Sequence, residues 1–155
     1  MNFKKNFIFF TIVIALLAMV FSCSKKENNA KDISIAIFIP GVVSENAVYE
    51  MFVAGSEKAI QKYSTNKDTA KINYQIIEAG TNQSEWPTKL TALCASEKWD
   101  LIFSSNPALP DILEPILEKF PQQNVIILDS YKPGINTMQT ILYNQRQQAL
   151  QRQKI

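Results

Sequence analysis

The sequence predicts an α/β domain of the doubly wound class, in which helices cover both faces of a parallel sheet. Apolar, β-branched runs alternate four times with stretches whose apolar residues recur at helical spacing. The intervals between the runs suit right-handed crossovers, which join parallel strands of one sheet. A hydrophobic fraction of 46% and a charged fraction of 19% are ordinary for a globular domain. Disorder is therefore not expected over the bulk of the chain.

Residues 1–22 are predicted to be a lipoprotein signal peptide rather than part of the fold. Two lysines precede an apolar run at residues 7–21, which is shorter than the roughly 20 residues that span a bilayer. The run ends in Val-Phe-Ser-Cys, so we expect cleavage before Cys23 and a lipid on its thiol. Residues 23–32 are polar and would tether the domain to the membrane. An uncleaved anchor helix or an ordinary secretory signal is the alternative.

The charge and the cysteine count exclude several classes of function. Removing the two lysines of the signal from 16 Lys and Arg leaves 14, which equals the 14 Asp and Glu. A nucleic-acid-binding surface is therefore not indicated. The chain has no histidine, and Cys94 is its only cysteine besides Cys23, so histidine-based catalysis and a zinc site are not expected. Cys94 lies among apolar residues in a segment with helical spacing and is expected to be buried and structural.

The first strand is expected at residues 33–39, a continuous run rich in β-branched and aromatic residues that indicates burial on both faces of the sheet. A Pro-Gly pair ends the run. Ser44 or Asn46 can then cap a helix that extends to about Lys62. The face of this helix expected to point inward carries Val48, Phe52, Gly55, Ala59 and Ile60.

A second strand and helix follow a polar loop at residues 64–70. Residues 71–77 have the pattern of a strand, and a turn at residues 79–86 comes next. Ser84 can cap the following helix, which tolerates Pro87 in its first turn. The inward residues of this helix are expected to be Leu90, Leu93 and Cys94.

The pattern continues with a third strand at residues 100–104 and a proline-rich loop. A helix is expected at residues 111–120, with an irregular first turn caused by Pro115. The fourth strand is expected at residues 124–129, and a fifth at residues 138–144 after a turn that contains Gly134. The inward residues of the helix are expected to be Ile112, Ile116, Leu117 and Phe120.

The candidate site lies in the loops after the strands, because doubly wound sheets bind ligands at the carboxyl ends of their strands. These loops contain no GxGxxG, GKS/T or GxSxG motif, so nucleotide-phosphate binding and a nucleophile elbow are not expected. No catalytic residue and no cofactor is predicted. Hydrogen-bonding and aromatic residues remain, and they suit reversible binding of a polar, planar small molecule. They are Ser44, Tyr49, Asn82, Gln83, Trp86, Asn106, Asp129 and Tyr131.

Several segments together carry a family resemblance. A cysteine with a short tether is followed by IAIFIPGVVSENAVYEMFVAG, EAGTNQSEWPTKLTALCASEKWDLIFSSNP, EPILEKFPQQNVIILDSY and ILYNQRQQ. In order and spacing these resemble the basic membrane protein family, the substrate-binding lipoproteins of ABC transporters typified by bacterial purine nucleoside receptors. The resemblance covers about residues 33–148. It implies that residues 33–143 are the N-terminal lobe of a type I periplasmic-binding-protein fold, which holds its ligand between two lobes; the second lobe is missing here.

The resemblance also implies roles for two residues. Tyr49 matches the aromatic residue of the family's first helix and would stack on the ligand, and Asp129 matches the strand-end acid and would accept hydrogen bonds from it. Alternatively, Tyr49 packs on the sheet and Asp129 caps a turn. Many family members carry Asp-Lys-Ser-Phe-Asn after the first strand, where this chain has PGVVSEN without an aspartate. A ligand other than a purine nucleoside therefore stays open.

The last twelve residues, 144–155, are expected to be the truncated start of the next helix or hinge region. Their apolar residues, Ala149, Leu150 and Ile155, form only a weak stripe. The resemblance implies a lipid-anchored protein on the outer or periplasmic side of a membrane that captures a nucleoside-like solute for an ABC permease. A truncated or pseudogene-derived surface lipoprotein without transport function is the alternative, and an enzyme of flavodoxin-like fold is a third reading.

Overall fold

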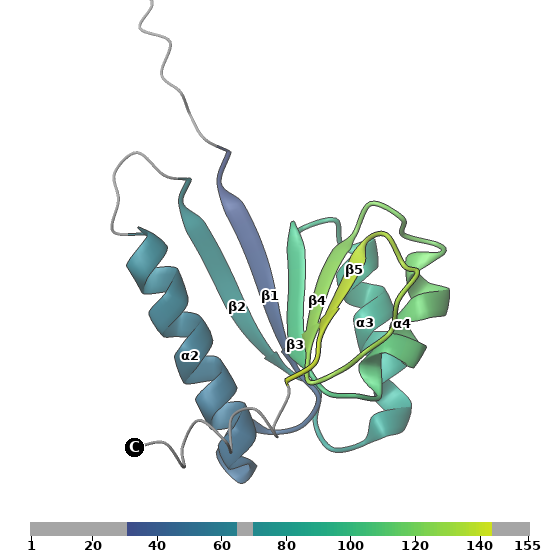
Figure 1. The fold of residues 1–155 in the computed structure, drawn as a ribbon, viewed down its shortest axis with the longest axis horizontal. Coiled ribbons are helices and arrows are strands. Elements are labelled where there is room, and N and C mark those ends of the chain that lie inside the picture. Colours follow the sequence, from purple (N-terminus) through teal and green to yellow (C-terminus); the bar gives the residue numbers. More distant parts are fainter. Residues whose placement is uncertain (1–30, 65–69, 144–155) are drawn as a thin grey trace, which may run out of the picture.

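The computed structural model describes residues 31–64 and 70–143. They form a five-stranded sheet with the order β2-β1-β3-β4-β5, and every neighbouring pair of strands is parallel. Helix α2 lies on one face of the sheet, and α3 and α4 lie on the other (Figure 1). The predicted doubly wound α/β fold is confirmed. The signal peptide, Cys23, most of the tether and residues 144–155 lie outside the described residues.

Strand β1 (Ile33–Ile39) is an interior strand of the sheet and lies between the edge strand β2 (Ile72–Glu78) and the central strand β3 (Leu101–Ser105). Its last four residues, Ala36 to Ile39, are 0% exposed. Successive strand residues point to opposite faces, so both faces of the sheet are covered at these four residues, as the run of β-branched and aromatic residues predicts. The sheet continues through β4 (Asn124–Leu128) to β5 (Met138–Ile141).

The main hydrophobic core lies between the sheet and the helices α3 (Trp86–Ala95) and α4 (Leu109–Leu117). All seven residues predicted to point inward from these two helices are buried or pack against this core, although α4 ends at Leu117, before Phe120. They are Leu90, Leu93, Cys94, Ile112, Ile116, Leu117 and Phe120. A smaller core lies between β1 and α2 (Ala47–Ser64), where Val53 packs against Ile37 and Ile39. The sheet therefore has one strongly covered face and one that is covered mainly over β1 and β2.

The cysteine in this core is predicted to be chemically inert. Burial raises the pKa of the Cys94 thiol to about 11. In a soluble form of residues 24–155, which lacks Cys23, we expect a disulfide reagent to label Cys94 at pH 8 at least about a hundredfold more slowly than in denaturant, because few thiolates form. Equal rates in the folded and unfolded protein would show that Cys94 is exposed.

The expected inward face of the first helix is partly wrong. Phe52 and Ile60 pack against the smaller core, but Val48 is 58% exposed, and Gly55 and Ala59 are exposed as well. The buried residues of α2 are Val53 and Ser56, whose hydroxyl donates to the Phe52 carbonyl oxygen at 2.7 Å. The apolar stripe is therefore turned toward the side of α2 that borders β3 and β4.

Three other boundaries differ from the prediction for local reasons. Ser84 does not cap α3: it lies in a single 3-10 turn, η2 (Gln83–Glu85), and Asn82 caps that turn by accepting from the Ser84 N–H at 3.3 Å. Helix α4 begins at Leu109, two residues earlier than expected, because Pro110 is tolerated in a first turn whose N–H groups need no partner. Strand β5 ends at Ile141 rather than at residue 144.

Candidate ligand site

A cavity of about 270 Å³ opens at the carboxyl edge of the sheet. The loops after β1, β2 and β3 contribute its walls, together with the first turns of α2 and α3. This is where the fold class predicts a ligand. The lining residues are Pro40, Gly41, Val42, Glu45, Asn46, Tyr49, Thr81, Gln83, Trp86 and Asn106.

Tyr49 and Asn106 meet in this cavity although they are 57 residues apart in the chain. The Tyr49 hydroxyl donates to the Pro40 carbonyl oxygen at 3.1 Å and accepts from the Asn106 side-chain amide at 3.4 Å. One edge of the tyrosine ring lies against Gly41, where an added Cβ would come within 2.7 Å of Tyr49 Cε2. Tyr49 is thus held in place by the loops after β1 and β3, with its ring half-buried.

The close approach at Gly41 gives a test of this arrangement. We expect Gly41→Ala to lower the free energy of unfolding by about 1–3 kcal/mol, because the new methyl group must displace a ring that two hydrogen bonds hold. Urea denaturation followed by circular dichroism measures it. Gly55→Ala is the matched control: nothing lies within 4 Å of its added Cβ, and alanine favours the helix by about 0.5–1 kcal/mol. Equal effects of the two changes would contradict the predicted crowding at Gly41.

Gln83 and Trp86 also line the cavity, but Trp86 is only 2% exposed. Its indole N–H donates to the Gly80 carbonyl oxygen at 2.9 Å, and the ring packs in the main core. Beside it, the Lys89 ammonium donates to the Ala79 carbonyl oxygen at 2.7 Å and pairs with Glu85 at 2.8 Å. Trp86 therefore forms the floor of the cavity, and its ring faces are largely used by the core.

The other predicted site residues lie outside the cavity lining. Ser44 is exposed in the turn η1 (Val43–Glu45), and the Asn82 side chain is used to cap η2 and to donate to Glu85 at 3.0 Å. Asp129 is exposed after β4, in left-handed backbone conformation with a φ of 55°. Tyr131, 73% exposed, follows it. The structure places Asp129 and Tyr131 at the same edge of the sheet but not in the cavity.

Sequence reasoning missed three polar lining residues, Glu45, Asn46 and Thr81, as ligand candidates. All three lie in the loops that follow β1 and β2. Their place at the carboxyl edge of the sheet was the signal by which the sequence could have indicated them. Asn46 also caps α2 by accepting from the Val48 N–H at 2.9 Å, one of the two capping residues that the sequence predicts. The loop that carries Glu45 is held by Glu78, which accepts from the Val43 N–H at 2.7 Å.

The comparison with protein families shows to which family the chain belongs. Residues 32–150 match the model of the family described as ABC transporter substrate-binding protein, PnrA-like. The chain belongs to this family. The resemblance seen in the sequence is thereby confirmed, and the carboxyl-edge cavity is in the part of the chain that the family model matches.

Two solved structures share the fold of this substrate-binding lobe. One is described as a lipoprotein of Peptoclostridium difficile 630, a fragment, with a TM-score of 0.56 and 18% identity over 79% of this chain and 98% of that one. The other is a solute-binding protein of an ABC transporter system from Aeropyrum pernix K1, with a TM-score of 0.59 and 15% identity over 70% of this chain. The match spans only 28% of the Aeropyrum chain, so the lobe corresponds to one part of that longer protein.

The charges around the cavity of the substrate-binding lobe limit its ligands. The lining residues named above include one carboxylate, Glu45, and no lysine, arginine or histidine. An anionic ligand such as a phosphate ester would have no opposite charge there to replace its hydration. The amides of Asn46, Gln83 and Asn106 can donate and accept hydrogen bonds with an uncharged ligand.

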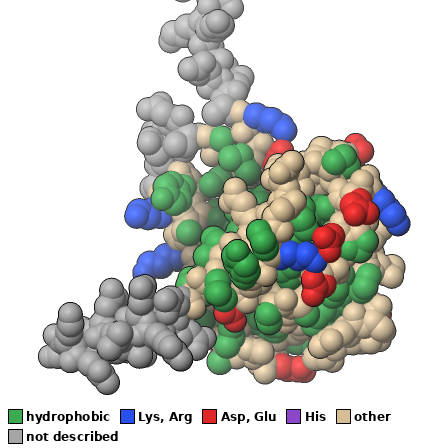
Figure 2. Space-filling model, turned by 45° about the vertical axis from the view of Figure 1, so that its right-hand side comes forward, with side chains coloured by type: hydrophobic (Ala, Val, Ile, Leu, Met, Phe, Trp, Pro, Cys, Tyr) green, Lys and Arg blue, Asp and Glu red, His purple; other side chains and the backbone are tan. Residues whose placement is uncertain are grey.

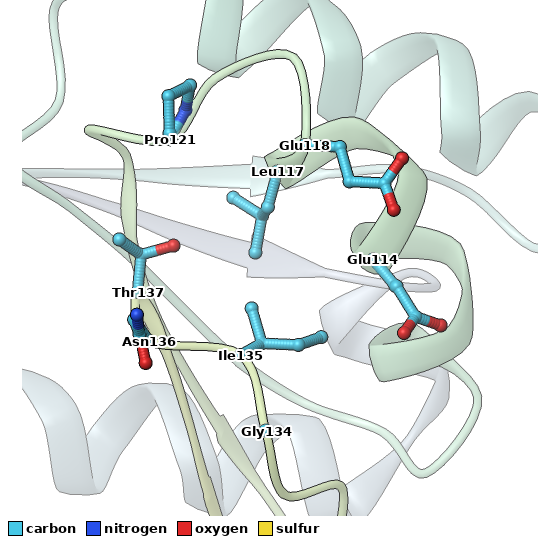
Figure 3. Close-up of a pocket in the computed structure, with 8 residues that line it drawn as sticks. All are labelled: Glu114, Leu117, Glu118, Pro121, Gly134, Ile135, Asn136 and Thr137. Atoms are coloured by element: carbon cyan, nitrogen blue, oxygen red, sulfur yellow. The ribbon is translucent and has the colours of Figure 1, made fainter.

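A second and slightly larger cavity, of about 340 Å³, lies away from the carboxyl edge (Figure 3). On one side the cavity is lined by Glu114, Leu117 and Glu118, in α4 and at its carboxyl end. On the other side it is lined by Ile135 and Thr137 of the segment before β5. This segment leads into the amino end of β5, opposite the edge where the lobe's candidate ligand residues meet. Nearby, Lys132 pairs with Asp111 at 2.7 Å and with Glu114, which joins the segment to α4.

Within residues 31–64 and 70–143, no group of three acidic, histidine or cysteine side chains is arranged to hold a metal ion. Among the helices that the structure describes, none combines the length and the hydropathy needed to cross a membrane.

Proposed function

We propose that this lobe binds an uncharged, nucleoside-like small molecule at its carboxyl edge and that it serves an ABC importer as a lipid-anchored substrate-binding protein. The single observation that carries the proposal is the meeting of Tyr49, Gln83 and Asn106 in one cavity of a chain that belongs to the substrate-binding family. The anchor would be a lipid on Cys23, and the partner in the membrane would be the permease. No catalytic role is proposed.

The chemistry of the lining supports a planar ligand with several hydrogen-bonding groups. The half-buried ring of Tyr49 offers a surface on which a base can stack, while its hydroxyl is already engaged with Pro40 and Asn106. Gln83, Asn106 and Thr81 can bond the edge of the base or the hydroxyls of a sugar. Glu45 would accept from a ribose hydroxyl or a ring N–H.

The remaining candidates would complete the site from its rim. Asp129 and Tyr131 follow β4 and are exposed at the same edge, so both can reach a ligand that extends beyond the cavity. Ser44 and Asn82 border the cavity through their neighbours Glu45 and Gln83. In this proposal Trp86 supports the cavity from below and does not stack on the ligand.

The proposal is tested by thermal denaturation of residues 24–155 with millimolar nucleosides, sugars and short oligopeptides. We expect nucleosides to raise the melting temperature and the other classes to leave it unchanged. Binding should be weak, because a single lobe offers only one side of a ligand that small-molecule sites usually enclose by 70–90%. A protein that responds to none of these compounds would contradict the proposal. Submicromolar affinity in isothermal titration would contradict the view that this lobe is half of the site.

A further inference from the structure

The connection between β4 and β5 differs from the other connections of the lobe because it contains no helix. Neighbouring parallel strands need a crossover that returns the chain to the other edge of the sheet, and this crossover is usually a helix. Residues 129–137 make the return as bends, a turn and extended chain. Helical hydrogen bonds therefore cannot hold this connection, and its course depends on its contacts with the strands and with α4.

The first residues of this connection are alternately exposed and anchored. Ser130 is buried, and its N–H donates to the carbonyl oxygen of Ile141, the last residue of β5, at 3.3 Å. Lys132 is half-buried. Asp129 and Tyr131, which lie on either side of Ser130 in the chain, are exposed at the carboxyl edge. Ser130 and Lys132 thus fix the segment, while Asp129 and Tyr131 are presented on its outer side.

The backbone of Asp129 needs such anchors. Its φ of 55° lies in the left-handed region, which residues with a side chain adopt only rarely. Aspartate tolerates this region better than most residues do, but a conformation of this kind persists only where the surrounding structure holds it. The contacts of the residues after Asp129 therefore decide whether its carboxylate keeps one direction at the edge of the sheet.

Lys132 joins the connection to two other elements, β5 and α4. Its backbone N–H donates to the Thr140 hydroxyl oxygen at 3.0 Å, and its ammonium group donates to Asp111 at 2.7 Å and pairs with Glu114. Asp111 and Glu114 lie one turn apart on α4. The Lys132 side chain is 23% exposed, so the ion pairs are partly shielded from water at the lysine. In the view that brings the side of α4 forward, basic and acidic side chains lie next to one another (Figure 2).

We propose that Lys132 is a positioning residue of the ligand site. By its ion pairs with α4 it fixes residues 129–131, and thereby it holds the Asp129 carboxylate in the direction of the ligand. This inference rests on the proposed function, in which Asp129 completes the site from its rim. Lys132 does not touch the ligand and acts only through the segment. The site is thus supported from α4, a helix that contributes none of the lining residues of the cavity.

Amide hydrogen exchange tests the positioning without any ligand. In residues 24–155, Lys132→Met should speed exchange of the Ser130 amide at least about tenfold relative to that of Ile37 in β1, because the link to α4 is lost. Lys132→Arg keeps the charge and should restore slow exchange. Lys31→Met is the matched control: it removes a lysine that pairs with Asp100 at 2.9 Å at the amino edge, and it should leave Ser130 unchanged. Unchanged exchange of Ser130 in Lys132→Met, or an equal acceleration at Ile37, would overturn the proposal.

A double-mutant cycle tests whether Lys132 acts on the ligand through Asp129. We expect Lys132→Met to weaken adenosine binding by about threefold to tenfold in the native chain and by less than about twofold in an Asp129→Asn background, where the positioned carboxylate is already lost. Titration followed by NMR measures the dissociation constants. Equal losses in the two backgrounds would overturn the proposal. If the native lobe binds no adenosine, the proposed function fails, and the exchange of Ser130 alone decides whether Lys132 fixes the segment.

Discussion

Replacing Trp86 with alanine is expected to lower the free energy of unfolding of residues 24–155 by about 3–5 kcal/mol. The residue is 2% exposed and packs in the main core, so its removal leaves a large cavity beneath the carboxyl edge. The Gly80 carbonyl oxygen also loses its hydrogen bond from the indole. Urea denaturation monitored by circular dichroism measures the change.

Two further variants show whether burial is the cause. Trp86→Phe keeps most of the apolar volume and should cost clearly less than the alanine variant. Tyr131→Ala removes an aromatic residue that is 73% exposed at the same edge and should change stability by no more than about 0.5 kcal/mol. If Trp86→Ala retained its stability but no longer responded to ligand, the indole would be a ligand residue rather than part of the core.

Replacing Tyr49 with alanine is expected to weaken the binding of adenosine by roughly fivefold to 150-fold, the equivalent of about 1–3 kcal/mol for one stacked base. The ring is half-buried in the cavity and is held there by Gly41, Pro40 and Asn106. Titration followed by NMR measures dissociation constants in the millimolar range that a single lobe should show.

Phenylalanine at the same position separates the ring from its hydroxyl. Tyr49→Phe keeps the stacking surface but removes the bonds to Pro40 and from Asn106, so adenosine affinity should change by less than about fivefold. An alanine variant that binds adenosine as well as the native lobe would show that the ring serves only to pack on Gly41.

The strands were the most predictable part of the fold. The last four residues of β1 are apolar, and both faces of the sheet are covered there. The alternation of strand and helix predicts that neighbouring strands pair in parallel. The helices that pack on the main core were predictable for the same reason: Leu90, Cys94, Ile116 and Leu117 recur at helical spacing and are all buried. Burial by a single, complete layer leaves a clear pattern in the sequence.

The orientation of α2 was not predictable from its own sequence. Its apolar stripe includes Gly55 and Ala59, which are exposed, while Ser56 is buried because its hydroxyl bonds back to the Phe52 carbonyl oxygen. Periodicity shows which residues share a face but not which neighbour covers that face. The start of α3 was missed because the 3-10 turn η2, capped by Asn82, comes before it, and α3 itself begins at Trp86 without a side-chain cap.

The candidate site was predictable as a place more than as a set of residues. Because ligands bind at the carboxyl ends of parallel strands, the sequence predicted that Tyr49, Gln83 and Asn106 lie at one edge of the sheet. All three residues line the cavity. The sequence could not rank residues within a loop: Glu45 lines the cavity, whereas its neighbour Ser44 is not among the lining residues. Trp86 was predicted to be a ligand-binding aromatic residue because its position in a loop does not show how deeply its side chain is buried.

The most direct test of the central claim is an NMR titration of isotope-labelled residues 24–155 with adenosine, with a sugar and an oligopeptide as controls. The claim is that the carboxyl-edge cavity is the ligand site of this substrate-binding lobe. It predicts that adenosine shifts the amide signals of Gly41, Thr81 and Asn106, which surround the cavity. Shifts that instead gather at Glu118 and Thr137, around the cavity beside α4, or no shifts with any compound at millimolar concentration, would contradict it.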